Sequence, residues 1–154
     1  MPRITRTADV SWEGSVARGG GTISGRSGAL AELPFTLASR IAEPEGKTSP
    51  EELLAAAHGG CFTMSLGSEL ASRGLTPTRL DVSVRIVMDE VEGKGHRIVR
   101  SEVGGTVSAD GLTDDVLAEA ARAADEGCPF SALIKASAEV VVDVRLAGEA
   151  GGAS

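Results

Sequence analysis

The stretch TSPEELLAAAHGGCFTMSLGSELASRG, residues 48–74, predicts a long helix with one cysteine, Cys61, inside an apolar run. Ser49 can cap the helix and Pro50 suits its first turn, while Glu52, three residues after Ser49, completes a capping-box pattern. Apolar side chains lie nearly all round the segment, which is typical of a buried central helix rather than a surface one. The cysteine is unusual because the chain has only two.

On either side of this helix the sequence predicts strands and a second helix. Alternating apolar and polar residues, interrupted by glycines, favour paired strands, and Thr113 followed by two aspartates is a good helix start. We expect a hairpin over residues 8–24, a strand over 34–42, a hairpin of long strands over 80–91 and 96–109, a helix over 113–127, a helical turn from 129 and a strand from 138. This order predicts an α+β fold with a mostly antiparallel sheet. We expect a single domain over 1–147 and a flexible tail over 148–154.

Composition narrows the possible partners. The formal net charge of −7 argues against nucleic acid and anionic membranes, because both attract clustered lysine and arginine. With a single Trp and no Tyr, the chain has little to stack on bases. No apolar run approaches the roughly 18 residues of a membrane span, and the first residues lack a signal-peptide pattern. We therefore expect a cytoplasmic protein whose partners are small molecules or other proteins.

Patterns for metal, phosphate or cofactor binding are weak. The chain has only two histidines, His58 and His96, and no C-x-x-C motif, so neither a metal site nor a cofactor is expected. The glycine-rich segment ARGGGTISGRSG, residues 17–28, is similar to a phosphate loop in composition. It lies within a predicted hairpin, however, whereas a phosphate loop joins a strand to a helix. A tight turn is the better interpretation.

The two cysteines are the main candidates for chemistry. Taken alone, Cys61 in an apolar helix could be an inert small hydrophobe. Cys128 lies between a helix-ending glycine and Pro129, where we expect it to be accessible and its thiolate to be stabilised by backbone N–H groups. Two thiols in different settings suggest peroxide reduction, in which one thiol becomes a sulfenic acid and the other condenses with it. Arg40 could be the cation that holds the thiolate, and Glu51 the carboxylate that positions Arg40. A cysteine hydrolase that uses His58, three residues before Cys61, is a weaker alternative because no third group orients the histidine.

The motifs resemble a known family. SPEELLAAAHGGCFTMSL, residues 49–66, is similar to the cysteine-bearing helix of the OsmC/Ohr family, the osmotically inducible and organic hydroperoxide resistance proteins. GCPFSALIKASAEVVVDVRL, residues 127–146, resembles the segment of that family's second cysteine. Two further stretches, SWEGSVARGGGTISGRSG and RGLTPTRLDVSV, resemble the OsmC branch in particular. The chain departs from the commoner pattern at Gly59 and Gly60, which puts the rigidity of the helix in doubt.

The resemblance implies a thiol-dependent peroxidase for organic hydroperoxides that forms an intertwined homodimer. It implies that Cys61 attacks the peroxide, that Cys128 resolves the product as a disulfide, and that Glu51 holds the catalytic arginine. The OsmC branch points to Arg40 as that arginine, whereas the Ohr branch points to Arg18. A dithiol reductant, lipoyl-bearing or thioredoxin-like, would then restore the thiols.

The apolar surroundings of Cys61 suggest how an organic substrate could bind. We expect the tail of the hydroperoxide to lie against Leu54, Phe62 or Met64. Two alternatives without turnover remain open at this point. The cysteines could form a redox sensor that switches conformation, or the chain could carry an apolar ligand while its thiols stay inert.

Overall fold

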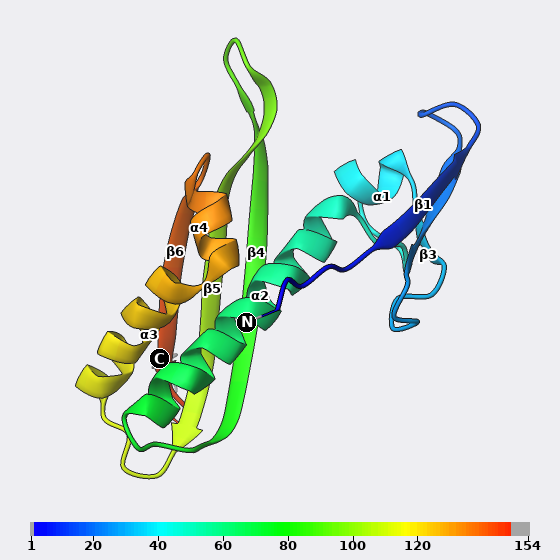
Figure 1. Cartoon of the computed structure of the whole chain (residues 1–154). Coiled ribbons are helices and arrows are strands. Elements are labelled where there is room, and N and C mark those ends of the chain that lie inside the picture. The colour runs from blue at the N-terminus through cyan, green and yellow to red at the C-terminus, as the bar shows by residue number, and fades with distance from the viewer. Residues whose placement is uncertain (1, 149–154) are drawn as a thin grey trace. The chain divides into compact units, whose positions relative to one another are not determined.

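The computed structural model describes residues 2–148, and this part of the chain divides between Leu53 and Leu54 into two compact units. Each unit contains a three-stranded sheet. The α+β class is confirmed (Figure 1). The single domain expected over 1–147 stays a prediction, and the tail expected over 148–154 lies, apart from Gly148, outside the described residues.

The sheet of the first unit is antiparallel throughout, with the order β1-β2-β3. Strand β1 covers Ala8–Glu13 and β2 covers Gly20–Gly25, so the hairpin predicted over 8–24 is confirmed. The glycine-rich segment forms β2 and its turns rather than a phosphate loop. Strand β3 is short, covering Leu33–Phe35.

Helix α1, Leu37–Ile41, replaces most of the strand predicted over 34–42, so that prediction was wrong beyond residue 35. The reason is a capping box. The Thr36 hydroxyl accepts a hydrogen bond from the Ser39 backbone N–H, and the Ser39 hydroxyl accepts one from the Thr36 N–H, each at 3.0 Å. These two bonds favour a helical turn over the extended conformation that the alternating apolar residues suggested.

The sheet of the second unit has the order β4-β5-β6. Strands β4, Pro77–Val91, and β5, Gly95–Ala109, form the predicted antiparallel hairpin. Strand β6, Glu139–Leu146, pairs with β5 in parallel. The sequence did not predict this direction. It follows from the two helices between β5 and β6, which form the crossover that a parallel pair requires.

Three helices complete the elements. They are α2, Pro50–Ser72, α3, Asp114–Gly127, and α4, Pro129–Lys135. The predicted caps are present: the Ser49 hydroxyl accepts from the Glu52 N–H at 3.2 Å, and the Thr113 hydroxyl accepts from the Val116 N–H at 3.4 Å. The other half of the predicted capping box differs, because the Glu52 carboxylate accepts a hydrogen bond from the Thr48 hydroxyl instead of the Ser49 N–H. It thereby ties the residue before the cap to the first helical turn.

Helix α2 continues without interruption through Gly59 and Gly60. At Gly59 a β-carbon would lie 3.2 Å from a methyl group of Val84, closer than ordinary van der Waals contact. The absent side chain therefore lets the helix approach strand β4. At Gly60 an added β-carbon would meet no neighbour within 4 Å. Packing against β4 therefore explains why residue 59 is a glycine, but it does not explain the glycine at position 60.

The core of the second unit lies between one face of its sheet and the helices, and Figure 1 shows α3 and α4 against this sheet. The buried side chains of α2 follow one stripe at four-residue spacing: His58, Phe62, Leu66 and Leu70. The three apolar ones among them pack with Val103 and Val107 of β5 and with the inner side of α3. Met64, outside that stripe, is 74% exposed. A single chain thus covers one side of this apolar helix.

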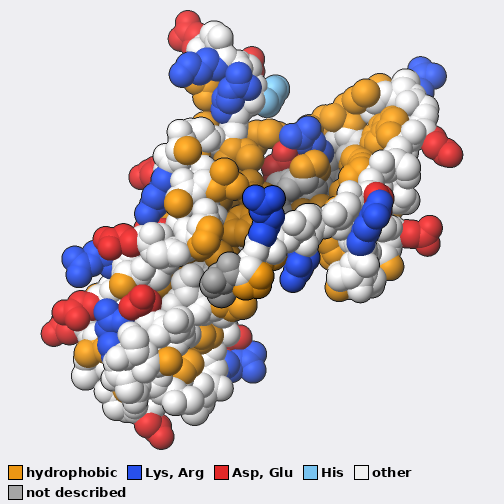
Figure 2. Space-filling model, viewed as in Figure 1, with side chains coloured by type: hydrophobic (Ala, Val, Ile, Leu, Met, Phe, Trp, Pro, Cys, Tyr) orange, Lys and Arg blue, Asp and Glu red, His pale blue; other side chains and the backbone are white. Residues whose placement is uncertain are grey.

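Hydrophobic side chains are also visible on the molecular surface in Figure 2. The large ones exposed in the first unit are Ile4, Val10, Val16, Leu30 and Ile41, and those in the second unit are Met64, Leu133 and Val141. Among residues 2–148, no helix is long and apolar enough to cross a membrane.

Candidate active site

The two cysteines meet in the second unit. Cys61 lies in helix α2, and Cys128 is at once the C-cap of α3 and the N-cap of α4. Cys61 packs against the core cluster that contains Cys128, their thiols lie close enough for Cys128 to raise the pKa of Cys61, and no disulfide joins them. Residues 67 positions apart in the sequence are therefore in direct contact.

The exposure of the two thiols is the reverse of what the sequence suggested. Cys128 is completely buried, because the junction of α3 and α4 packs into the hydrophobic core, whereas Cys61 is partly exposed. The expectation of an accessible Cys128 was wrong. An incoming oxidant in solution can therefore reach Cys61 more readily than Cys128.

The surroundings of Cys61 favour its protonated form. Burial is the main factor that raises the pKa of this thiol, and the hydrogen bond with Cys128 raises it further. The backbone of Phe130 and the side chain of Ser65 hydrogen-bond Cys61 and lower its pKa, without reversing the effect. Cys61 thus needs a nearby cation to become a thiolate readily at neutral pH.

The first unit brings Arg40 and Glu51 together. The Nε and Nη2 atoms of Arg40, in α1, donate to one oxygen of Glu51, in the first turn of α2, at 2.8 and 2.6 Å. The other oxygen of Glu51 is buried and has no hydrogen-bond partner among the described residues. Arg18 lies exposed in the turn between β1 and β2, where its backbone N–H bonds to Ser15. The ion pair therefore favours Arg40 as the positioned cation.

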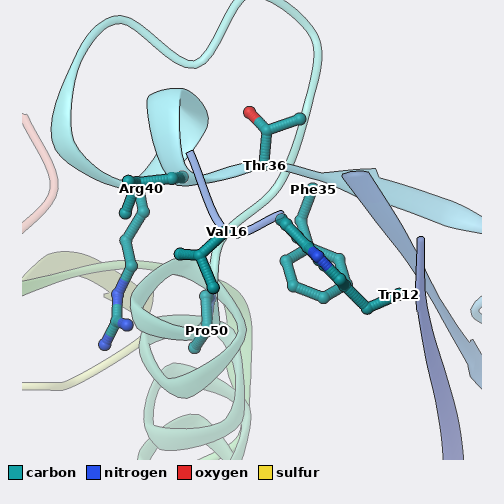
Figure 3. Close-up of a pocket in the computed structure, with 7 residues that line it drawn as sticks. Trp12, Val16, Phe35, Thr36, Arg40 and Pro50 are labelled. Atoms are coloured by element: carbon teal, nitrogen blue, oxygen red, sulfur yellow. The ribbon is translucent and has the colours of Figure 1, made fainter. Parts of the chain in front are cut away.

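An apolar pocket of about 220 Å³ lies beside Arg40 within the first unit. In Figure 3 the rings of Trp12 and Phe35 lie next to each other, and their centroids are 5.3 Å apart. The pocket is lined by Trp12, Val16, Phe35, Thr36, Leu37, Arg40 and Pro50. Sequence reasoning missed it because its aromatic residues come from two strands. Phe62, expected to line a substrate site, is fully buried in the core of the second unit and unavailable.

His58 does not have the environment of a catalytic base. It is completely buried, and its two ring nitrogens hydrogen-bond the hydroxyls of Ser101 and Ser131. Burial is the main factor that lowers its pKa. With both nitrogens engaged away from Cys61, the hydrolase alternative has no base. Among residues 2–148, no group of three or more histidine, cysteine or acidic side chains is placed to hold a metal.

Comparison with known proteins identifies the family. The family model described as OsmC-like protein matches residues 43–143. The chain belongs to the OsmC family. The protein named peroxiredoxin OsmC from Escherichia coli is 35% identical over 143 residues, which cover 93% of this chain and 97% of that protein.

Solved structures of the family share the fold. The organic hydroperoxide resistance protein OhrB of Bacillus subtilis matches with a TM-score of 0.70 and 23% identity, covering 90% of this chain and 97% of that one. An organic hydroperoxide resistance protein from Elizabethkingia anophelis matches with a TM-score of 0.73 and 19% identity, covering 94% and 99%. The OsmC-like fold predicted from the sequence is therefore confirmed.

Proposed function

We propose that this protein is a thiol-dependent peroxidase that reduces organic hydroperoxides. The observation that carries the proposal is the direct contact between Cys61 and Cys128, two thiols of unequal exposure. The names of the relatives, peroxiredoxin and organic hydroperoxide resistance protein, support a redox role of this kind.

The proposed reaction has two chemical steps before reduction. The Cys61 thiolate attacks the outer oxygen of the hydroperoxide, the O–O bond breaks, and the leaving alkoxide takes up a proton to become an alcohol. The sulfur of Cys128 then attacks the Cys61 sulfenic acid and releases water, forming a disulfide. A dithiol reductant restores both thiols and becomes a disulfide itself. Each cycle therefore consumes one hydroperoxide and one dithiol.

Arg40 and Glu51 supply the positive charge in this proposal. Because burial raises the pKa of Cys61, attack at neutral pH requires a cation that stabilises the thiolate. The two hydrogen bonds from Arg40 to Glu51 hold the guanidinium in one orientation. Glu51 thus acts as a positioning residue, and Arg40 supplies the cation that stabilises the thiolate.

The pocket beside Arg40 provides the substrate specificity. Burial of three or four methylene groups contributes roughly 2 to 3 kcal/mol, equivalent to about 30- to 150-fold in kcat/KM. The experiment compares cumene and fatty-acid hydroperoxides with hydrogen peroxide, at limiting enzyme and with excess dithiothreitol. We expect a preference of that size for the organic peroxides.

The same assay separates the proposal from its alternatives. Consumption that stops after one equivalent of peroxide per chain, despite excess dithiol, would support a redox sensor. An unchanged intact mass after peroxide treatment would support an apolar-ligand carrier with inert thiols. Equal or greater efficiency with hydrogen peroxide would contradict the substrate specificity while leaving the peroxidase activity in place.

Replacement of Arg40 by alanine tests the source of the positive charge. Its loss raises the pKa of the Cys61 thiol, so the thiolate fraction falls most at neutral and lower pH and recovers as pH rises above the new pKa. We expect the first oxidation to slow by about 10- to 100-fold near neutral pH. Stopped-flow measurement across a pH series gives the profile.

Arg18→Ala is the matched control for this prediction, and its pH profile should follow that of the unmodified protein. A shift with Arg18→Ala and none with Arg40→Ala would assign the charge to Arg18 instead. Disulfide formation should remain possible in Arg40→Ala, because the contact between the two thiols does not involve the arginine.

We also propose a homodimer that works in a cytoplasmic, reducing compartment. The apolar side chain of Met64 is 74% exposed on α2, outside the stripe that the chain buries, and such a side chain is stabilised when a second copy covers it. A monomeric mass by light scattering at micromolar concentration would contradict the dimer. The reductant in this proposal is a dithiol, carried by a lipoyl group or by a thioredoxin-like protein.

A further inference from the structure

Three polar side chains form a buried bridge in the second unit. Nδ1 of His58 lies 2.7 Å from the Ser101 hydroxyl, and Nε2 lies 2.8 Å from the Ser131 hydroxyl. All three residues are completely buried. The peroxidase mechanism above gives none of them a role.

The bridge matches the hydrogen-bonding capacity of a neutral imidazole, which has one donor and one acceptor nitrogen. One hydroxyl can donate to the ring while the other accepts from it. Burial lowers the pKa of His58; Asp125 opposes this effect and Lys135 adds to it. The neutral ring is therefore the favoured form, and both of its bonds are directional and shielded from water.

The position of the bridge relates it to the two thiols. His58 lies three residues before Cys61 in α2, on the preceding helical turn. Ser131 lies three residues after Cys128, in the first turn of α4. Ser101 belongs to β5, the central strand of the sheet. The imidazole thus links the segment of one cysteine to the segment of the other and fixes both to the sheet.

We propose that His58, held by Ser101 and Ser131, is a positioning residue that keeps the Cys61 and Cys128 thiols at the separation needed for disulfide formation. Helix α4 is short, and its N-cap, Cys128, makes no side-chain capping bond. The Ser131 bond is therefore a major polar restraint on the start of this helix. Its use in peroxide reduction rests on the proposed function, but the effect on the dithiol–disulfide equilibrium does not.

The test measures that equilibrium without peroxide. The full-length protein is equilibrated with mixtures of reduced and oxidised glutathione, quenched with acid and analysed by intact mass. One oxidised glutathione takes two electrons from the two cysteines, giving the protein disulfide and two reduced glutathiones. The ratio at half oxidation gives the effective concentration of one thiol toward the other. Loss of one buried hydrogen bond in Ser131→Ala is expected to lower this value by about five- to tenfold.

Two further variants separate positioning from general stability. Ser131→Thr keeps the hydroxyl and is expected to stay within about twofold of the unmodified protein. Thr113→Ala removes the N-cap of α3 in the same unit and lowers the stability of the protein, but it does not touch the bridge. In this variant the effective concentration of one thiol toward the other should therefore be unchanged. Ser101→Ala loosens the ring indirectly and should have a smaller effect than Ser131→Ala.

An unchanged effective concentration in Ser131→Ala, or an equal decrease in Thr113→Ala, would overturn the positioning role. Failure of the proposed function has a different signature. The unmodified protein would form the disulfide with glutathione, and Ser131→Ala would weaken it, yet neither would consume hydroperoxide. The serine variants also avoid dependence on His58→Gln, which removes a fully buried ring and could prevent folding.

Discussion

Cys61→Ser is expected to abolish consumption of organic hydroperoxide, with a decrease in kcat/KM of at least about three orders of magnitude. The serine hydroxyl is not ionised near neutral pH and cannot replace a thiolate as nucleophile. Cys128 cannot substitute for Cys61, because it is completely buried at the junction of α3 and α4. The measurement is peroxide loss in the presence of excess dithiothreitol, together with intact mass after a single addition of peroxide.

The expected mass of peroxide-treated Cys61→Ser is that of the untreated variant. A stable gain of oxygen on Cys128 would mean that the buried thiol reacts directly, and that the roles of the two cysteines are reversed. The melting temperature should stay close to that of the unmodified protein, because Cys61 is partly exposed and the two side chains are similar in size. Comparable stability separates a chemical loss from an unfolded variant.

Local signals allowed most of the secondary structure to be predicted. The caps at Ser49 and Thr113 are set by residues within the same turn, so their sequence patterns suffice. The error over residues 34–42 has the same local character. Thr36 and Ser39 form a capping box, but the alternating apolar residues beside them outweighed that signal in the prediction.

Contacts between distant segments were beyond the reach of sequence patterns. The hydroxyls that bond His58 come from residues 43 and 73 positions away, and nothing near them in the sequence marks them as its partners. The burial of Cys128 likewise depends on how α3 and α4 pack against the sheet. The parallel direction of β6 depends on the path of the crossover. Each of these features is tertiary, and each bears on the candidate site.

The candidate residues themselves were found because their types are rare in this chain or lie in recognisable motifs. Two cysteines among 154 residues attract attention, and Glu51 stands in the first turn of a well-marked helix. Arg40 was harder to select, because charged residues are common. Both Arg40 and Arg18 are exposed, and the two hydrogen bonds to Glu51 distinguish Arg40 from Arg18.

Cys128→Ser is expected to lose turnover while it keeps the first chemical step. One equivalent of hydroperoxide per chain should be consumed at nearly the unmodified rate, because Cys61 is the more exposed thiol and attacks alone. The reaction then stops at the Cys61 sulfenic acid, since no neighbouring thiol remains to displace water. Steady-state consumption with a reductant that acts only on the disulfide should fall by at least about a hundredfold.

Mass spectrometry resolves these states. The unmodified protein should lose two hydrogens after one equivalent of peroxide and regain them with dithiothreitol. Cys128→Ser should gain one oxygen that a sulfenic-acid reagent traps, and excess peroxide should add a second oxygen that dithiothreitol does not remove. The Cys128 thiol is one factor that raises the pKa of Cys61, and a serine hydroxyl in its place can donate a hydrogen bond to the thiolate, so the replacement is not expected to slow the first step. A marked decrease in the rate of the first oxidation would therefore show that Cys128 takes part in the attack on the peroxide, and not only in its resolution.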